Sequence, residues 1–458
     1  MNETTKTIHF KSALVGEEWI DDPVFSVDSN GMITNIATAS ANQQVSDSFD
    51  AVALPGMPNV HSHAFQRAFA GLSEFRTADN DSFWTWRKLM YDFLLKLSPE
   101  DVYVIARQLY IEMLLAGYTW VGEFHYVHND IQGNHYACLS ELSDAVIRAA
   151  NDVGIGICML PVLYQRGGFD DQPLSKGQQR FQLGNEDFLK LFEDLSSHKS
   201  DNFNLGIALH SLRAVCVDSA KHVIDNIPGD FKIHVHVAEQ TKEIEDCLAK
   251  HSKRSVQFLL DHFDVDQRWC LIHATHLDDA EVSGIAKSGA VVGLCPTTEA
   301  NLGDGIFRAK DYLDAGGKIS IGSDSHCSVD LREELRILEY GQRLQGRNRA
   351  VLGTSEKSVG RRLYQSTAAG GGQAIGVKTG SLQTGFRADF TIVDPNHPAI
   401  AGANGNALID RLIFCNADDP IVGAIVGGQV KMMDDPEFFE IVQQSHIDFN
   451  TVSRRLMT

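Results

Sequence analysis

Short apolar runs alternate along most of the chain with longer segments whose apolar residues recur at helical spacing. The shortness of these runs and their β-branched content favour strands over buried helices. There are eight of them: the run that ends at His61, 118–124, 154–163, 204–209, 231–237, 269–272, 290–294 and 318–321. Helical periodicity marks the segments between them, which include 99–116, 139–153, 241–262 and 331–344. Nearly continuous apolar strands that alternate with helices predict an α/β fold, specifically a (β/α)8 barrel of the TIM type.

Both ends of the chain have a different texture, in which short strand-like stretches are separated by tight turns. Before residue 54 these stretches are 7–10, 24–27 and 32–36, and near the other end they are 388–393 and 421–426. Such strands and turns predict that the two termini pair into one small β domain, written here as a β-sandwich. We therefore expect residues 1–54 and 381–458 to form that domain and 55–380 to form the barrel.

Several predicted strands end in a side chain that can bind a metal ion. His61 and His63 stand two positions apart on an extended segment, so their side chains point the same way and can hold one ion together. His236, His273 and Asp324 each end, or closely follow, a later apolar run. Reactive groups of such barrels lie at the C-terminal ends of the strands. The order of these residues therefore predicts a metal-assisted hydrolase.

The same rule chooses between neighbouring histidines. His234 and His236 share a face of one strand, but His236 is nearer the mouth and is followed by Glu239, so we assign His236 to the metal and His234 to the interior. His273 lies at a strand end, whereas His276 lies further into the loop and is expected to be structural. A structural role is also expected for the remaining candidates, His125, His128, His251, His262 and His397.

Composition and charge narrow the functional classes. The 458 residues are 43% hydrophobic and carry a net charge of −20 without a basic stripe, which opposes binding to nucleic acid or to an anionic membrane. The first residues do not form a signal peptide, and no run of about 18 apolar residues occurs, so we expect a cytoplasmic protein. The eight cysteines are scattered without a Cys-x-x-Cys pair, which predicts unpaired, buried thiols.

The residues named above resemble the amidohydrolase superfamily. The resemblance rests on His61-Ser62-His63, His236, His273 and Asp324 at their strand ends and extends to residues 384–391 near the C-terminus. Members with two metals usually carry a carboxylated lysine after the fourth strand. Here that strand is followed by His210, so the resemblance implies one ion. The spacing of His236 and Glu239 is that of the deaminase branch.

Four further segments, 58–67, 122–126, 210–215 and 295–305, resemble the branch that hydrolyses N-formimino-L-glutamate during histidine degradation. That resemblance implies conversion of a formimino group to a formyl group with release of ammonia, by a homodimer. It also implies a role for each candidate residue: His61, His63, His236 and Asp324 as zinc ligands, Glu239, His273 and Asp324 in proton transfer, and Gln66, Arg87, Tyr126, His210 and Arg213 in substrate binding.

The residue types suit this chemistry. Zinc activates water, Asp324 can accept a proton, Glu239 can deliver one to the departing nitrogen, and His273 can hydrogen-bond the attacking oxygen. Arg87 and Arg213 could each hold one carboxylate of a small dicarboxylate substrate. Structural readings remain: Glu239 could cap the helix from residue 241, and the arginines could form ion pairs. Iron or manganese could replace zinc in such a site.

Two other functions remain open. Phe65, Phe83, Trp84 and Trp86 would suit a deaminase of a purine, pyrimidine or guanidine compound, although they could equally pack a core. A non-enzymatic metal-stabilised scaffold would be expected to lack the proton-transfer groups, which are present. The segment 77–92 is a candidate lid over the site.

Overall fold

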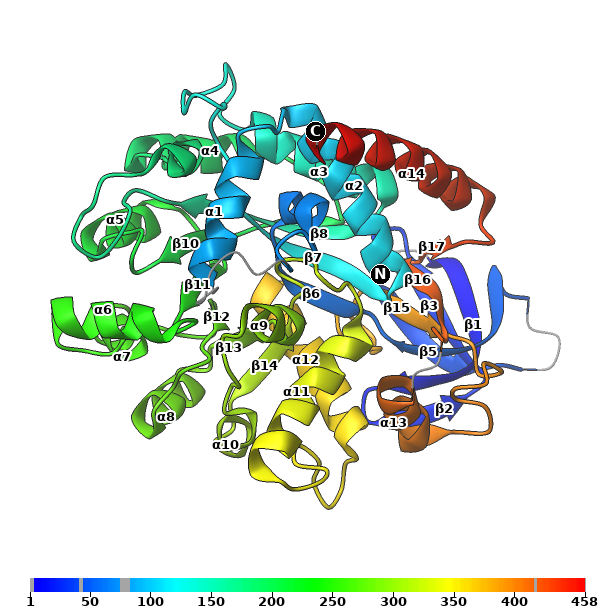
Figure 1. Cartoon of the computed structure of the whole chain (residues 1–458). Coiled ribbons are helices and arrows are strands. Elements are labelled where there is room, and N and C mark those ends of the chain that lie inside the picture. Colours follow the sequence, from blue (N-terminus) through cyan, green and yellow to red (C-terminus); the bar gives the residue numbers. More distant parts are fainter. Residues whose placement is uncertain (1–3, 41–43, 75–82, 416–417, 458) are drawn as a thin grey trace.

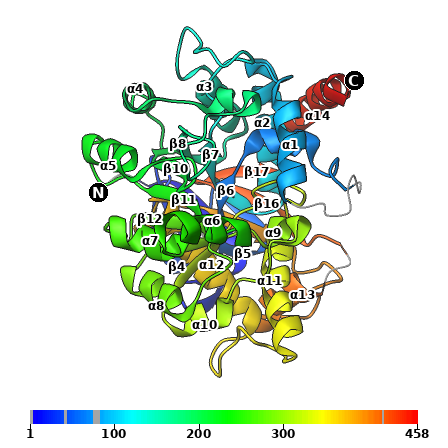
Figure 2. The ribbon, with the colours of Figure 1, turned by 60° about the vertical axis from the view of Figure 1, so that its left-hand side comes forward.

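The computed structural model describes residues 4–40, 44–74, 83–415 and 418–457. Eight parallel strands form a nearly closed barrel whose strand order follows the chain (Figures 1 and 2). The barrel closes where the Asp324 backbone N–H donates to the carbonyl of His61 over 3.0 Å. Its strands are β6 (Met57–Ser62), β7 (Tyr118–His125), β8 (Gly156–Leu163), β10 (Ile207–Ser211), β11 (Ile233–Val237), β12 (Trp269–His273), β13 (Val291–Leu294) and β14 (Lys318–Ile321), and the short β9 (Phe203–Leu205) pairs with β8. This architecture confirms the predicted barrel.

Helices surround the barrel, as Figure 2 shows. The predicted helical segment 241–262 forms two helices, because Ser252 adopts a left-handed φ of 55° and ends the first. The surrounding helices are α2 (Pro99–Leu115), α3 (Glu141–Val153), α4 (Asn185–Leu195), α5 (Val217–Asn226), α6 (Thr241–His251), α7 (Ser255–His262), α8 (Asp279–Ser288), α9 (Pro296–Leu302), α10 (Ala309–Asp314), α11 (Leu331–Gly346) and α12 (Val359–Ile375).

Helix α12 lies unusually close to the barrel wall. A Cβ atom on Gly370 would come within 2.1 Å of the Ile319 carbonyl oxygen, and one on Gly371 within 2.9 Å of Pro58. Only glycine permits this approach of helix to strand. The short glycine run at 370–372 therefore seats α12 against β14 and β6, the two strands that close the barrel.

The termini form a second, mixed sheet beside the barrel (Figure 1). Its eight strands are β1 (Thr4–Val15), β2 (Glu18–Asp21), β3 (Pro23–Asp28), β4 (Ile33–Thr38), β5 (Asp47–Pro55), β15 (Phe390–Val393), β16 (Ile421–Val426) and β17 (Gln429–Met432). Strand β5 joins the two ends, since it pairs parallel with β1 and antiparallel with β15. Phe10, Phe25 and Phe390 contact one another in a separate core. The predicted small domain built from both termini is confirmed.

Buried Asp389 connects this sheet to the barrel. Its carboxylate accepts hydrogen bonds from Trp120 Nε1 at 3.0 Å, Thr379 Oγ1 at 2.7 Å and the Gly427 backbone N–H at 2.7 Å.

Two late helices, α13 (Gly405–Phe414) and α14 (Pro436–Met457), pack on helices of the barrel. Helix α13 packs on α11 and α12, and helix α14 packs on α2. The domain limits after residues 54 and 380 stay predictions.

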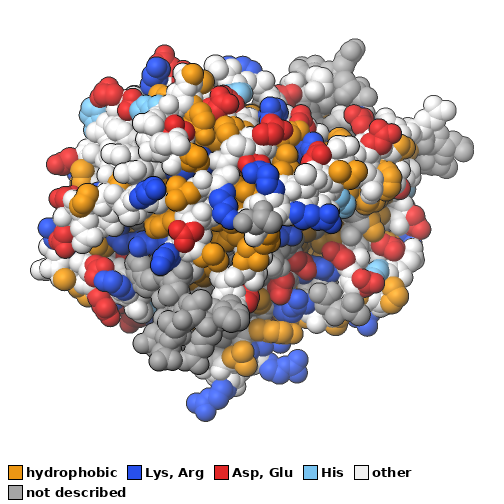
Figure 3. Space-filling view, turned by 45° about the horizontal axis from the view of Figure 1, so that its top comes forward, with side chains coloured by type: hydrophobic (Ala, Val, Ile, Leu, Met, Phe, Trp, Pro, Cys, Tyr) orange, Lys and Arg blue, Asp and Glu red, His pale blue; other side chains and the backbone are white. Residues whose placement is uncertain are grey.

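The charged side chains on the surface and the cysteines can now be compared with the sequence-based expectations. Acidic and basic side chains are intermixed on the face that Figure 3 shows, and none of the helices in the described residues is long and apolar enough to cross a membrane. All eight cysteines are unpaired. The expectation of burial was wrong for Cys138, Cys327 and Cys415, which are exposed because they lie in loops between elements, and Cys216 is only partly buried.

Candidate metal and catalytic site

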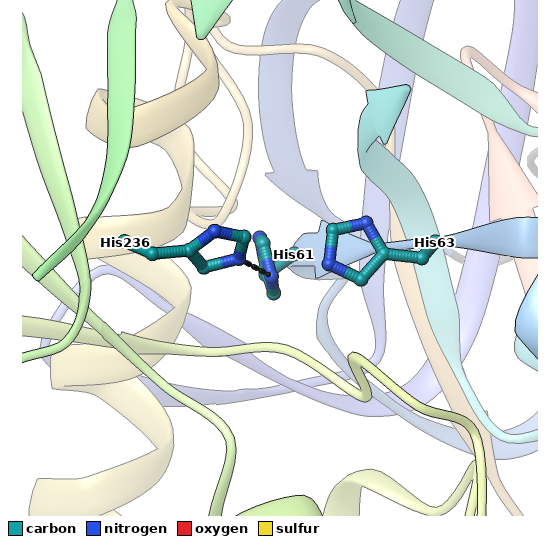
Figure 4. Close-up of side chains that lie close together, drawn as sticks. All are labelled: His61, His63 and His236. Carbon is teal, nitrogen blue, oxygen red and sulfur yellow. Dashed lines mark hydrogen bonds between the residues drawn. The ribbon is translucent and has the colours of Figure 1, made fainter. Parts of the chain in front are cut away.

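Three histidine rings converge at the C-terminal ends of the strands. His61 lies at the end of β6, His63 follows that strand, and His236 lies in β11, and all three side chains are buried (Figure 4). The Nε2 atoms of His61 and His236 are 3.0 Å apart. These three histidines form a group whose ligand atoms are close enough to hold one metal ion.

Hydrogen bonds behind the rings fix which nitrogen faces the centre. Nδ1 of His63 donates to the Phe124 carbonyl and Nδ1 of His236 to the His210 carbonyl, each over 2.8 Å. Burial lowers the pKa of His63, and it lowers the pKa of His61 and His236 well below the usual range, so the rings are neutral. The two Nδ1 bonds turn the Nε2 lone pairs of His63 and His236 toward the centre, where His61 Nε2 also lies. Such convergent lone pairs favour a cation between them, with the outer bonds orienting the ligands.

Asp324 completes the ring of ligand atoms. Its Oδ1 lies 3.4 Å from His63 Nε2 and 3.5 Å from His61 Nε2. The residue holds a left-handed φ of 46°, a region that is uncommon outside glycine and that aspartate visits more often than most other residues. Three imidazoles and one carboxylate suit zinc, and they also accommodate iron or manganese.

His273 and Glu239 lie on the cavity side of this group. Nε2 of His273 is 3.8 Å from Asp324 Oδ2, and Glu239 is only 5% exposed. Burial raises the pKa of Glu239 to about 6. Burial by itself would lower the pKa of His273, but the neighbouring carboxylates, Glu239 foremost, outweigh it and raise that pKa to about 10. The site thus holds a carboxyl able to carry a proton near neutral pH beside a cationic ring.

A small cavity of about 50 Å³ opens beside these groups. The structure brings all five predicted substrate-binding residues to its wall: Gln66, Arg87, Tyr126, His210 and Arg213. His63, His236, Glu239, His273 and Asp324 line it as well, whereas His61 is fully buried behind them. Inside the cavity, Gln66 Nε2 donates to the Tyr126 hydroxyl over 2.9 Å.

Five wall residues were not singled out from the sequence: Met90, Tyr91, Tyr164, Phe181 and Leu302. Tyr164 directly follows strand β8, so its place at a strand end was a usable signal. Its ring lies 4.4 Å from that of His210, and its hydroxyl accepts a bond from Gln178 Nε2 over 2.7 Å. Tyr91 and Phe181 come from connecting helices, which no strand-end rule identifies.

The candidate lid contributes one cavity wall. Residues 77–82 lie outside the described residues, but helix α1 (Phe83–Leu94) brings Trp86, Arg87, Met90 and Tyr91 to the cavity. Buried Arg180, on the short helix η2 (Lys176–Phe181), donates to the carbonyls of Leu94 and Leu97, the latter over 3.1 Å. A cation at the carbonyl end of α1 complements the helix dipole and anchors that end. Closing of the segment stays a prediction.

Two of the histidines that were expected to be structural bind backbone carbonyls rather than the metal group. His234 binds the Ala374 carbonyl through Nε2 at 2.9 Å, and His128 binds the Val162 carbonyl at the same distance. Of the aromatic candidates for a ring deaminase, Phe65 is buried and its ring centre lies 5.3 Å from that of the wall residue Tyr126. Among the other aromatic residues considered for a ring deaminase, Trp86 lines the cavity, while the side chains of Phe83 and Trp84 lie outside the described residues.

Comparison with known proteins places this site in a family. Residues 52–431 match the Amidohydrolase family. The chain is 49% identical to formimidoylglutamate deiminase of Pseudomonas aeruginosa over 93% of its length and 94% of that protein. It is 22% identical to 5-methylthioadenosine/S-adenosylhomocysteine deaminase of Natronomonas pharaonis, over 90% and 88% of the two chains.

Solved structures agree in fold. A crystal structure of an amidohydrolase from Brucella melitensis superposes with a TM-score of 0.91 at 40% identity, covering 99% of this chain and 100% of that one. An adenosine deaminase from Xanthomonas campestris with bound zinc has a TM-score of 0.78 at 19% identity, over 97% and 98% of the two chains. Barrel, histidine group and sequence match lead to the same conclusion, and the chain belongs to the amidohydrolase family.

Proposed function

We propose that the protein hydrolyses N-formimino-L-glutamate to N-formyl-L-glutamate and ammonia. The observation that carries the proposal is one cavity lined both by a metal-binding His and Asp group and by Arg87 and Arg213. The resemblance to the Pseudomonas aeruginosa formimidoylglutamate deiminase supports the same substrate. The proposed reaction makes the protein a hydrolase of a linear amidine, acting in histidine degradation.

We infer that the metal is one zinc ion held by His61, His63, His236 and Asp324. The neutral rings with their Nε2 atoms turned inward, and the carboxylate beside them, fit a divalent cation. When bound, zinc lowers the pKa of water to roughly 7 and so supplies hydroxide at neutral pH. Iron and manganese are the alternatives, and metal analysis of the isolated protein distinguishes the three.

The chain's own residues then move the protons. Asp324 takes a proton from the water at the site, and His273 directs the attacking oxygen by a hydrogen bond. Attack on the imino carbon forms a tetrahedral intermediate, and Glu239 gives a proton to the nitrogen that leaves as ammonia. A carboxyl with a pKa of about 6 can both carry and release a proton near neutrality.

Two arginines in a protein of charge −20 give the cavity its preference for anions. Arg213 is 8% exposed and lies two residues after the end of β10, and Arg87 reaches the cavity from α1. Guanidinium groups bind carboxylates through paired, charge-assisted hydrogen bonds, which are strongest where water is excluded. We infer that these two residues hold the two substrate carboxylates, while Tyr126, Gln66 and His210 orient the molecule without adding charge.

Ammonia release from a panel of substrates tests the proposal. The zinc-loaded protein should turn over N-formimino-L-glutamate well above N-formimino-L-aspartate, N-carbamimidoyl-L-glutamate, guanine and cytosine. A second candidate, a ring deaminase, is favoured by the aromatic wall of Trp86, Tyr91, Tyr164 and Phe181. Turnover of a ring compound with silence on the formimino acids would establish that candidate. Inactivity on the whole panel would favour the non-enzymatic scaffold, which the presence of Glu239, His273 and Asp324 opposes.

Removing the Arg87 side chain should raise KM for the dicarboxylate substrate far more than for a monocarboxylate analogue. A charge-assisted hydrogen bond contributes about 1.5–3 kcal/mol, which corresponds to roughly 10- to 100-fold in KM for Arg87→Ala. The exposed neighbour Lys88 on the same helix provides the control, since Lys88→Ala should leave KM unchanged. Equal effects of Arg87→Ala on both substrates would refute the role as a carboxylate clamp.

Oligomeric state and cellular location remain expectations from the sequence. A homodimer predicts a mass near twice that of the chain in light scattering, and the cytoplasmic location can be tested by cell fractionation.

A further inference from the structure

The catalytic candidate His273 contacts a buried carboxylate on the side away from the cavity. Its Nδ1 lies 3.3 Å from Oε1 of Glu299, a residue of helix α9 that is 5% exposed. The same Oε1 accepts the backbone N–H of Cys295 over 2.8 Å. Glu299 does not line the cavity, so it acts on the substrate only through His273.

Helix α9 holds Glu299 in place from both sides. At its start, the backbone N–H and the hydroxyl of Thr297 donate to Glu334 over 2.9 Å and 2.6 Å. One residue on, the Thr298 hydroxyl lies 2.9 Å from that of Ser325, beside Asp324. A carboxylate on so well anchored a turn fixes its partner's direction with little loss of conformational freedom.

The contact determines how the imidazole faces the reaction centre. With Nδ1 turned to Glu299, Nε2 faces Asp324 Oδ2 at 3.8 Å. The ring lies nearly parallel to that of His236, at 13° and 5.6 Å between centres. His273 and Ala274 both adopt left-handed φ angles, 68° and 47°, so the backbone there is strained and the surrounding contacts must hold it.

We propose that Glu299 is a positioning residue, whose carboxylate accepts a hydrogen bond from the Nδ1–H of His273 and so keeps Nε2 directed at the reacting atoms beside Asp324. This inference rests on the proposed function, because His273 takes part in catalysis only if the hydrolysis proposed above is correct. Three side chains then follow one another toward the reacting atoms: the Glu299 carboxylate, the His273 imidazole and the Asp324 carboxylate. Such outer hydrogen bonds set the orientation of a working imidazole.

A different use of the same residues would be a second metal site. His273, Cys295 and Glu299 have ligand atoms close enough to one another to hold an ion. Burial raises the pKa of the Cys295 thiol well above its usual range, and the thiolate is the form that binds metals. The backbone bond from Cys295 to Glu299 also occupies the oxygen that faces His273. These observations favour positioning over a second ion.

Substitutions at Glu299 test the proposal. Glu299→Gln keeps an oxygen for Cys295 and His273 but removes the charge, and Glu299→Leu removes both. Losses on the order of 10- to 100-fold are typical when an outer partner of a metal-site residue is removed. We expect kcat to fall about 10-fold in Glu299→Gln and about 100-fold in Glu299→Leu, with KM within about twofold of wild type and one zinc per chain retained.

Glu334→Gln is the matched control, because Glu334 is a fully buried carboxylate that anchors the same helix without touching His273. It should leave kcat unchanged and alter only the melting temperature. If Glu299→Gln keeps the wild-type kcat, or if its loss merely follows a fall in zinc content or melting temperature, the positioning role is wrong. Two zinc ions in the wild type and one in Glu299→Leu would establish the second metal site instead.

A spectroscopic readout separates this inference from the proposed function. In zinc-loaded protein labelled with 15N-histidine, the Nδ1 signal assigned to His273 should show a retained proton in wild type and in Glu334→Gln, and should change in Glu299→Leu. This measurement needs no substrate. If the protein is inactive on N-formimino-L-glutamate but the His273 Nδ1 signal does change in Glu299→Leu, only the proposed substrate is wrong. If the Nδ1 signal is unchanged in Glu299→Leu, the positioning role is wrong.

Discussion

Replacing Glu239 with glutamine should lower kcat for ammonia release by about 10²- to 10⁴-fold while zinc binding is retained. General acid and base groups contribute factors of this size, and an amide cannot donate and recover a proton as a carboxyl does. Glu239 lines the cavity but is not among the residues grouped as metal ligands, so the variant should lose chemistry without losing the ion. Steady-state kinetics with metal analysis on the same sample measures both.

The control for this variant lies four residues further along the chain. Glu243 is also a buried carboxylate, but it accepts the backbone N–H of Ala238 over 2.9 Å and does not line the cavity. Glu243→Gln should therefore affect the melting temperature more than kcat. A Glu239→Gln variant that retains most of the wild-type kcat would show that Glu239 only caps the helix beginning at Thr241, the structural reading of the sequence.

The strand ends were predictable because the physical signal is local. A strand buried on both faces must be apolar throughout, so a histidine or an aspartate at its end is conspicuous, as His61, His236 and Asp324 are. Position along the strand also distinguished His236 from His234, whose Nε2 binds the Ala374 carbonyl instead. The barrel and the place of its candidate ligands therefore follow from periodicity and one topological rule.

Residues brought to the site by tertiary packing gave no such signal. Tyr91 reaches the cavity from α1, and the end of that helix is anchored by Arg180, a contact between segments far apart in the sequence. Glu299 contacts His273 from helix α9, although 26 residues separate the two along the chain. Neither a period nor a spacing encodes these contacts. The broken helix at Ser252 was missed for a related reason, since a left-handed φ is available to serine but not specified by it.

The backbone adopts strained conformations at the candidate site. Left-handed φ angles occur at His273, Ala274 and Asp324, all next to the reacting groups. Each such residue costs of the order of 1–3 kcal/mol and persists only where neighbouring contacts determine it. The barrel-closing bond from Asp324 to the His61 carbonyl and the Glu299 contact are two of those determinants. Fixed placement of Asp324 and His273 is what their proposed roles in proton transfer and orientation would require.

Removing the imidazole of His236 should abolish metal binding and lower kcat by on the order of 10³-fold or more, whereas removing that of His234 should do neither. A catalytic metal supplies several kcal/mol of transition-state stabilisation, which corresponds to that factor. The two residues are both buried histidines, two positions apart on β11. A comparison of the two variants therefore keeps the strand, the residue type and the burial the same. Only His236 faces His61, with 3.0 Å between the Nε2 atoms.

Metal analysis, kcat and melting temperature should be measured for His236→Ala and His234→Ala side by side. His234→Ala loses one hydrogen bond and leaves a cavity in the barrel interior, so its melting temperature should fall while zinc and kcat per folded protein stay near wild type. Added zinc should raise the melting temperature of that variant but not of His236→Ala, because a ligand stabilises only a protein that binds it. Zinc loss in His234→Ala with retention in His236→Ala would reverse the assignment, and with it the expectation that the ion lies at the mouth of the barrel rather than within it.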